Sequence, residues 1–410
     1  MIRKITIDQL LPGMYVVDLH KRWFDHSIWQ LRFKVRDEAH IWKLREEGIS
    51  EVSIDTDKGI DLPPPPPEPA AAIARINRID SRLKTLAGLR SAMPIAVSLG
   101  EERRRATRLL SEASGTVNSL MLAARAGLTV DAAHLEPVIT KMIASVGRNP
   151  DGLVPLARLK HHDAYATEHA VATAALIIAF GRHQGLPEPE IEKLALGTMV
   201  KDIGQTALDA RLIAKRGILS KDEFSIVQSH VEEGLSVLEA TSRLAETSVA
   251  VVLEHHERYN GAGYPYRMAG DEISAAGRMA AIVDTYDAMT SDRPYRAAMS
   301  PSHVLRQLYD EGGSQYDPEL VAAFVKTVGI YPVGTLVLLE SGHLAVVEQM
   351  HPENMLTPIV RVFYHTGRRQ YVTTPAEVDL SRKVGNHYGQ IVRAETFERW
   401  GINPLSWQPV

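Results

Sequence analysis

Four histidines and two aspartates between residues 169 and 284 have the types and spacing to bind metal ions. Each stands at the end or on the inner face of an apolar, helix-like segment that must pack into the interior. A buried charge or imidazole needs a partner or a metal, and imidazole with carboxylate ligands suits Fe, Mn, Zn or Ni. Taken singly, each residue is more often a helix cap or a surface group than a metal ligand. The set comprises His169, Asp202, His230, His255, His256 and Asp284.

A lysine directly precedes one of these aspartates, in the segment LGTMVKDIGQTAL. An ordinary lysine keeps its proton at neutral pH, and an ammonium has no lone pair with which to bind a metal. Lys201 would therefore repel a nearby dication and pair with Asp202 and Asp284. The alternative is that Lys201 turns to solvent, or loses its proton, so that His169 and the two aspartates still hold a weaker metal.

Helices must bring these residues together. Residues 148–330 are helical in pattern throughout, and His169 and Asp202 stand at the ends of apolar runs. The segment SKDE, Ser220–Glu223, has the form of a capping box that begins the helix carrying His230. Adjacent histidines on a helix point about 100° apart, so His255 and His256 both reach one site only at a frayed helix end or at the edge of the site.

The pattern along the whole chain predicts a mainly α protein, a helical bundle with a small N-terminal α+β module, long connecting helices and a short β-rich C-terminal piece. Prolines in PPPPPEP favour a stiff spacer, and the long helices after it are compatible with a homodimer. The predicted parts are an N-terminal accessory domain of residues 1–147 (α+β module 1–62, linker 63–69, helices 70–147), a helical domain of residues 148–330 and a β-rich C-terminal extension of residues 331–410.

Composition narrows the class of protein. A chain of 410 residues is too long for one ordinary core, and a net charge of −4 gives no reason to expect nucleic acid as a partner. The absence of cysteine excludes thiolate metal sites and disulfides. The N-terminus lacks a signal-peptide core, and the most apolar run is about half as long as a membrane span. We therefore expect a cytoplasmic protein without a membrane span.

Several segments resemble, in order and spacing, the motifs of HD-GYP domains, the bacterial cyclic di-GMP phosphodiesterases. HHERYNGAGYP, which begins at His255, resembles their HHE-x-x-D-G-x-GYP signature, and VDTYDAMTSDRPYR is close to the family consensus. YATEH and ILSKDEFSIVQSHVEEG resemble the segments bearing their first and next histidines. The resemblance covers about residues 160–305, and the preceding part of the chain resembles an accessory domain of unknown function found before some members.

The resemblance implies an HD-domain-like, all-α bundle around a centre of two or three divalent metals, Fe, Mn or similar. One metal would take His169, the His and Asp of the HD pair, and Asp284. The second would share that aspartate and take three histidines, which here are His230, His255 and His256. No third metal is expected, because Tyr165 stands where some members carry a glutamate.

The resemblance also implies a ligand, cyclic di-GMP. Its phosphates would be held by Arg293 and Arg296, for which a surface salt bridge is the alternative role. Tyr264, Gly263 and Pro265 of the GYP loop would complete the binding site, and the same loop would dock other signalling proteins.

Two positions depart from the family pattern HD-I-G-K, because this chain has Lys201-Asp202-Ile203-Gly204-Gln205. The name-giving histidine is a lysine, and the phosphate-binding lysine is Gln205; Asn260 is a milder change. Losing a charged group around a transition state costs orders of magnitude in rate, so we expect slow or absent hydrolysis. Three functions stay open: a metal-dependent phosphodiesterase giving pGpG or GMP, an inactive cyclic di-GMP receptor or protein-interaction module, and, least favoured, a scaffold without ligand.

Overall fold

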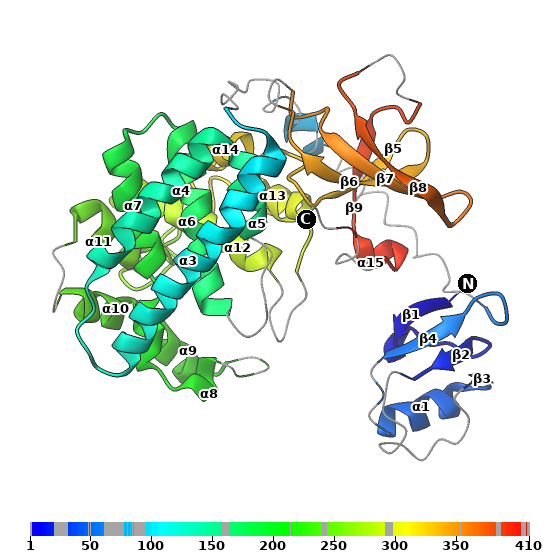
Figure 1. Cartoon of the computed structure of the whole chain (residues 1–410). Coiled ribbons are helices and arrows are strands. Elements are labelled where there is room, and N and C mark those ends of the chain that lie inside the picture. The colour runs from blue at the N-terminus through cyan, green and yellow to red at the C-terminus, as the bar shows by residue number, and fades with distance from the viewer. Residues whose placement is uncertain are drawn as a thin grey trace. The chain divides into compact units, whose positions relative to one another are not determined.

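The computed structural model forms two compact units, residues 1–70 with 397–403, and residues 71–396 with 404–410 (Figure 1). It describes residues 2–19, 32–47, 49, 51–60, 78, 79, 81–83, 85, 96–157, 165–213, 215, 217, 219–239, 244–291, 298–351, 354–382, 387–402 and 407. The predicted linker, residues 63–69, lies outside the described residues. The boundaries of the three predicted domains stay a prediction.

The first unit contains the predicted α+β module. Its antiparallel sheet has the strand order β1-β4-β2-β3, and alternating apolar residues such as Val16, Val52 and Ile54 are buried on it. The short strand β3 was not predicted. The elements are β1 (Ile2–Thr6), η1 (Ile7–Gln9), β2 (Tyr15–Asp18), β3 (Phe33–Lys34), α1 (Glu38–Glu46), β4 (Glu51–Asp55) and α15 (Phe397–Trp400).

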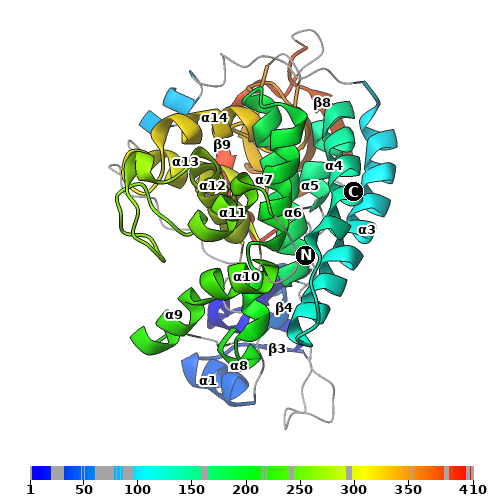
Figure 2. The ribbon, with the colours of Figure 1, turned by 90° about the vertical axis from the view of Figure 1, so that its left-hand side faces the viewer.

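The second unit is the helical bundle that the apolar pattern predicted. Helix α6 is apolar on nearly every face and is buried from His169 to Gly181, so it lies in the interior and packs against α3, α4, α5, α7, α12 and α14. Figure 2 shows α6 beside α7 in the bundle. The helices are α3 (Leu99–Arg125), η3 (Ala132–Leu135), α4 (Glu136–Arg148), α5 (Pro150–Ala157), α6 (Tyr165–His183), α7 (Glu188–Val200), η5 (Ile203–Ala207), α8 (Ala210–Ile213), α9 (Lys221–Gln228), α10 (His230–Glu239), α11 (Glu246–Glu254), η6 (Gly270–Glu272), α12 (Ala275–Thr290), α13 (Pro301–Asp310) and α14 (Pro318–Val328).

One helix boundary differs from the prediction. The capping box at Ser220 and Glu223 is present, but the helix that it begins, α9, ends before His230, which starts α10 instead. The hydroxyl of Ser229 donates to the carbonyl of Ile226 (2.9 Å), and His230 Nδ1 donates to that of Val227 (2.6 Å). These side-chain bonds use carbonyls of the last turn, so the helix breaks there.

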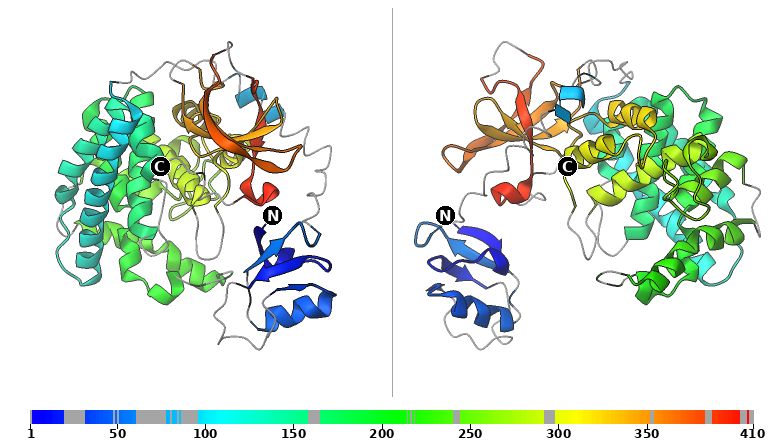
Figure 3. Two further views of the ribbon diagram at one scale, coloured as in Figure 1. Left: turned by 45° about the vertical axis from the view of Figure 1, so that its right-hand side comes forward. Right: turned by 180° about the vertical axis from the view of Figure 1, so that it is seen from behind.

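The four predicted C-terminal strands and one further strand, β9, form an antiparallel sheet of order β8-β7-β6-β5-β9 (Figure 3). Its apolar residues, among them Val337, Val347 and Val360, belong to the same buried cluster as the helices, so sheet and bundle share one core. Strand β9 was not predicted. The strands are β5 (Leu336–Leu339), β6 (His343–Gln349), β7 (Ile359–His365), β8 (Gln370–Asp379) and β9 (Ile391–Glu395).

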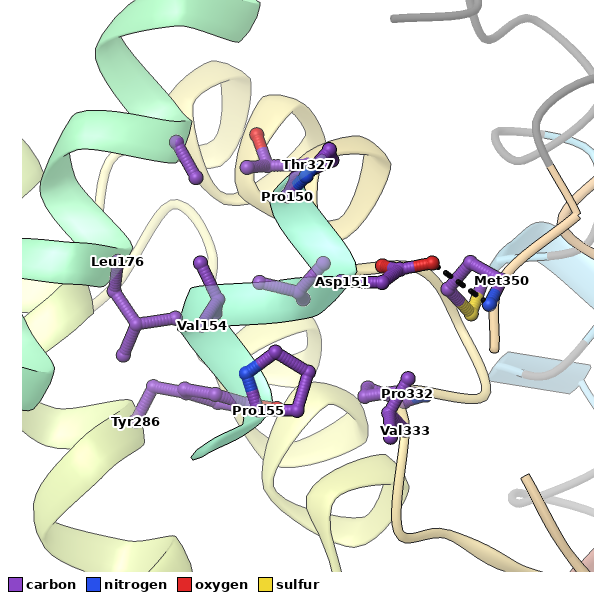
Figure 4. Close-up of a pocket in the computed structure, with 12 residues that line it drawn as sticks. Pro150, Asp151, Val154, Pro155, Leu176, Tyr286, Thr327, Pro332, Val333 and Met350 are labelled. Carbon is purple, nitrogen blue, oxygen red and sulfur yellow. Dashed lines mark hydrogen bonds between the residues drawn. The ribbon is translucent and has the colours of Figure 1, made fainter. Parts of the chain in front are cut away.

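A small cavity lies where the bundle meets the sheet, lined by Leu176, Tyr286 and Pro332 among others (Figure 4). In the wall of this cavity, Asp151 Oδ2 accepts a hydrogen bond from the backbone N–H of Met350, 2.9 Å away. Its volume of about 40 Å³ has room for a few water molecules at most. None of the predicted site residues lines it.

No helix in the described part of the chain is long and apolar enough to span a lipid bilayer.

Candidate metal centre

The six predicted ligands meet inside the bundle, brought there by five helical segments. His169 lies one turn inside α6, because that helix begins at Tyr165 and not at the histidine itself. Asp202 follows the end of α7, and His230 is the first residue of α10. Two groups of ligand atoms result, each within 4.8 Å: a first ligand group (His169, Asp202, Asp284) and a second ligand group (Asp202, His230, His255, His256).

Two imidazole nitrogens of the second ligand group have no hydrogen-bond partner in the described structure. His230 Nδ1 and His255 Nδ1 lie 2.6 Å and 2.9 Å from the carbonyls of Val227 and Val252. A carbonyl only accepts, so both protons sit on Nδ1 and each Nε2 keeps a lone pair. Both Nε2 atoms are buried without a hydrogen-bond partner in the described structure, and they lie 3.6 Å and 3.9 Å from Asp202 Oδ1. Orphaned lone pairs beside a carboxylate are what a metal requires.

The protonation of these histidines also suits a metal. Burial, helped by the charge of Lys201, lowers the pKa of His255 to about 3. Burial and the neighbouring His255 likewise hold the pKa of His256 well below its ordinary value. Neutral imidazole is the form that coordinates metals, so the second ligand group fits a divalent ion at neutral pH.

The first ligand group is occupied by Lys201. Its side chain is fully buried, and its Nζ donates to Asp202 Oδ2 and lies 2.6 Å from Asp284 Oδ1. The same Nζ lies 3.1 Å from His169 Nε2. The ammonium therefore lies among the three atoms that would bind a metal. The side chain is buried and does not turn to solvent, and its charge opposes the binding of a second divalent ion among these residues.

The charges of this cluster support one another. Burial alone would lower the pKa of Lys201, but Asp202 and Asp284 more than offset this and raise it above the ordinary value. Burial alone would raise the pKa of Asp202 and of Asp284, and in both cases the lysine is the main group that holds it well below its ordinary value. Lys201 is therefore an ammonium in this arrangement, and the neutral lysine considered from the sequence is disfavoured.

Two further polar residues contact the ligands. Gln205 Nε2 donates to Asp202 Oδ1 (2.7 Å), so the predicted catalytic position does touch the shared ligand. Asp287 Oδ2 accepts from His169 Nδ1 (2.5 Å), a partner that was not predicted. Asp284 and Asp287 are three residues apart on one helix and so face the same side, which is the signal that could have identified Asp287.

A glycine sets the distance between the turn of Asp202 and helix α10. A Cβ on Gly204 would clash with the backbone carbonyl of His230 and with the backbone nitrogen of Gly234. Only glycine allows the two backbones to approach so closely. This contact brings Asp202 and His230 into one group.

The GYP loop folds back onto the histidine pair. Its Tyr264 ring stacks on His256 with centroids 4.6 Å apart, and Pro265 follows in the same turn. A Cβ on Gly263 would clash with the backbone of Glu257 and Arg258, so this position requires glycine. Arg293 and Arg296, the predicted phosphate-binding residues, lie outside the described residues.

Glu257 anchors this loop and was not predicted as a site residue. Its carboxylate is buried and accepts the backbone N–H groups of Tyr266 (2.7 Å), Arg267 (3.0 Å) and Met268 (3.1 Å). Burial raises the pKa of Glu257 despite these three bonds. A carboxylate that holds three successive amides fixes the backbone beside His256.

Comparison with protein families defines the class of this chain as an HD-domain protein. The HD domain model matches residues 154–320, and a domain of unknown function, DUF3391, matches residues 2–135.

One relative extends the match to nearly the whole chain. The cyclic di-GMP phosphodiesterase PA4108 of Pseudomonas aeruginosa is 39% identical over 407 residues, covering 99% of this chain and 95% of that protein. The chain belongs to the HD-GYP family of cyclic di-GMP phosphodiesterases. A cyclic di-GMP phosphodiesterase of Thermotoga maritima is 30% identical, over 41% of this chain and 46% of that protein. Among solved structures, Bd1817, an HD-GYP-type protein from Bdellovibrio bacteriovorus, covers 79% of this chain and 98% of its own, with 13% identity and a TM-score of 0.46.

Proposed function

We propose that this protein binds cyclic di-GMP at a site holding one divalent metal, hydrolyses it slowly or not at all, and acts as a receptor in cyclic di-GMP signalling. The observation that carries the proposal is the buried Lys201 ammonium, 2.6 Å from Asp284 and 3.1 Å from His169. A cation already paired with both carboxylates repels a dication strongly at such distances in a poorly solvated interior.

The single metal, Fe²⁺ or Mn²⁺, would be held by the second ligand group. When bound, such an ion supplies positive charge to a phosphate oxygen of the ligand. The orphaned Nε2 atoms of His230 and His255 support this assignment. Tyr264, stacked on His256, would form one wall of the ligand site, and the phosphates would be held by Arg293 and Arg296, which are assigned from the motif alone.

We expect slow hydrolysis because Lys201 stands where the family has a histidine, and Gln205 where it has a phosphate-binding lysine. Lys201 contributes a fixed single charge, and an ammonium cannot act as a Lewis acid toward water or phosphate. Gln205 is neutral and already donates to Asp202, so it offers the transition state no charge. Losing such groups costs orders of magnitude in rate, whereas binding depends on more contacts and survives better.

An active phosphodiesterase is the second candidate. It is favoured by the 39% identity to a cyclic di-GMP phosphodiesterase over nearly the whole chain, and by the retention of the second ligand group. A role in which the GYP loop docks a protein partner is compatible with either activity.

Binding, metal content and turnover, measured on the same protein, test the proposal. The full chain would be loaded without oxygen with Fe²⁺ or Mn²⁺, and its metal content measured by mass spectrometry. Binding of cyclic di-GMP would be measured by calorimetry, and pGpG and GMP by chromatography. We expect one metal per chain, saturable binding and little or no product. Turnover at the rate of the double variant Lys201→His, Gln205→Lys would overturn the receptor assignment, and failure to bind would reject the proposal.

A further inference from the structure

Helices α8 and α9 leave large apolar side chains exposed beside the candidate metal centre. Neither helix has a buried residue. In α9, Phe224 is 46% exposed and Ile226 is 50% exposed. Figures 1 and 2 show both helices at the end of the bundle beside α10, the helix that begins with His230. An exposed aromatic ring at the edge of a ligand site is a feature that needs an explanation, unlike a scattered surface leucine.

The Phe224 ring continues a row of rings that starts at the metal ligands. Phe224 meets Tyr264 edge-to-face, with centroids 5.9 Å apart and an interplanar angle of 81°. Tyr264 in turn stacks on His256, with centroids 4.6 Å apart and an angle of 28°. The row therefore runs from the second ligand group to Phe224, which is 46% exposed.

Local contacts hold this outermost ring in place. Ser220 and Glu223 form the capping box of the turn that carries Phe224, and Lys215 pairs with Glu223 at 2.6 Å. On the other side, Glu257 fixes the loop that carries Tyr264. A ring positioned by its neighbours stacks on a ligand with little loss of conformational entropy.

We infer that Phe224 and Tyr264 form a stacking subsite for one purine base of the nucleotide whose phosphate lies at the metal centre. The inference rests on the proposed function and adds a recognition element to it. A cyclic dinucleotide carries a base on either side of its phosphates, so a base must point away from the metal toward the edge of the site. Every base has a π face, and aromatic side chains at such edges bind it by stacking.

Calorimetry with the Mn²⁺-loaded full chain and cyclic di-GMP tests the subsite. We expect Phe224→Ala to weaken binding about ten- to a hundredfold, as is typical when a stacking ring is removed. Phe224→Trp should bind within about threefold of the unmodified protein, since indole also stacks. Ile226→Ala is the matched control, because residues two apart on a helix do not share a face, and it should bind normally. Inorganic phosphate, which has no base, should bind Phe224→Ala and the unmodified chain equally.

The outcomes separate this inference from the proposed function. If the unmodified chain does not bind cyclic di-GMP, the proposed function and the subsite both fail. If it binds and Phe224→Ala binds equally well, the subsite is wrong and the proposed function stands. Equal weakening of phosphate and dinucleotide would place the effect at the metal centre and reject stacking. A change in sedimentation without a change in affinity would make the exposed ring a self-association surface instead.

Discussion

The two ligand groups share Asp202 but differ in what their atoms contact. In the first, Lys201 provides a cation to both carboxylates and lies 3.1 Å from the imidazole nitrogen of His169. In the second, two buried imidazole nitrogens have no hydrogen-bond partner in the described structure. Native structures leave few buried polar atoms unsatisfied, so the second group points to an external ligand and the first does not. Retention of ligand residues is therefore a weaker guide to metal binding than the unmet bonding capacity of their atoms.

A third buried cluster shows what a purely structural ion pair looks like. Glu102 is fully buried and accepts from Ser145 Oγ (2.6 Å) and from Arg148 Nε (2.7 Å) and Nη2 (2.8 Å). It joins α3 to α4, and within the described structure no buried side-chain nitrogen or oxygen of Glu102, Ser145 or Arg148 lacks a hydrogen-bond partner. The Lys201 cluster resembles it in being satisfied, which supports the view that Lys201 replaces a metal and does not assist one.

The double variant Lys201→His, Gln205→Lys should have the largest effect. It removes the buried cation, restores a ligand and returns a charge near the phosphate, so we expect turnover of cyclic di-GMP to rise about a thousandfold or more. Metal content should rise from one to two ions per chain. Product chromatography and metal analysis measure both, and an unchanged metal content would mean that the two groups do not differ as proposed.

The single change Lys201→Ala tests whether the cation holds the first group together. Without metal it leaves Asp202 and Asp284 buried without the cation that pairs with both, which should lower the free energy of unfolding by about 3–5 kcal/mol. Added Mn²⁺ should restore much of this loss, because a dication can then occupy the vacated place. Thermal unfolding with and without Mn²⁺ gives the answer; a loss that Mn²⁺ does not change would argue against the substitution of a metal by lysine.

Replacing one ligand of each group with alanine should show directly which group binds the metal. His255→Ala removes a ligand from the second group, so Mn²⁺ affinity should fall more than the ten- to hundredfold typical of changes to outlying partners. His169→Ala alters only the first group and should change affinity by less than about tenfold. Calorimetric titration of the metal-free proteins with Mn²⁺ compares them, and equal losses in the two variants would contradict a single-metal site.

Substitution of Glu102 should have the smallest effect on stability, and this effect should not depend on metal. Burial would raise the pKa of Glu102, but Arg148 and Ser145 hold it below its ordinary value. A carboxyl with a lowered folded-state pKa stabilises the fold above its unfolded-state pKa, and this contribution is lost as pH falls through the folded value. Glu102→Gln should cost about 1–2 kcal/mol at pH 7, since Arg148 is partly exposed.

Thermal unfolding of both proteins between pH 7 and pH 3 checks this last point. The difference in stability should shrink as the solution becomes acidic, because the unmodified protein then also loses its charge at Glu102. Mn²⁺ should leave the difference unchanged at every pH. A metal-dependent difference would mean that α3 and the metal centre are energetically coupled.

Much of this molecule was predictable from local pattern. The helical bundle, the α+β module and most of the C-terminal strands follow from apolar periodicity, which is a property of neighbouring residues. The missed strand β3 (Phe33–Lys34) is only two residues long. Both it and the missed strand β9 (Ile391–Glu395) depend on partner strands elsewhere in the chain. The break between α9 and α10 was missed because it depends on where the side chains of Ser229 and His230 form hydrogen bonds.

The sequence by itself determined the chemical types at the site: four imidazoles and two carboxylates in a family order, with a lysine where a histidine is usual. Acid–base character belongs to the residue type, so the presence of Lys201 in the sequence already predicted a conflict with a metal. Only the tertiary structure decided how that conflict is resolved. His169 and Asp284 are 115 residues apart, and folding alone places the Lys201 ammonium between them while leaving His230 and His255 with open lone pairs. Burial and long-range packing set these contacts, and neither is encoded in a local stretch of sequence.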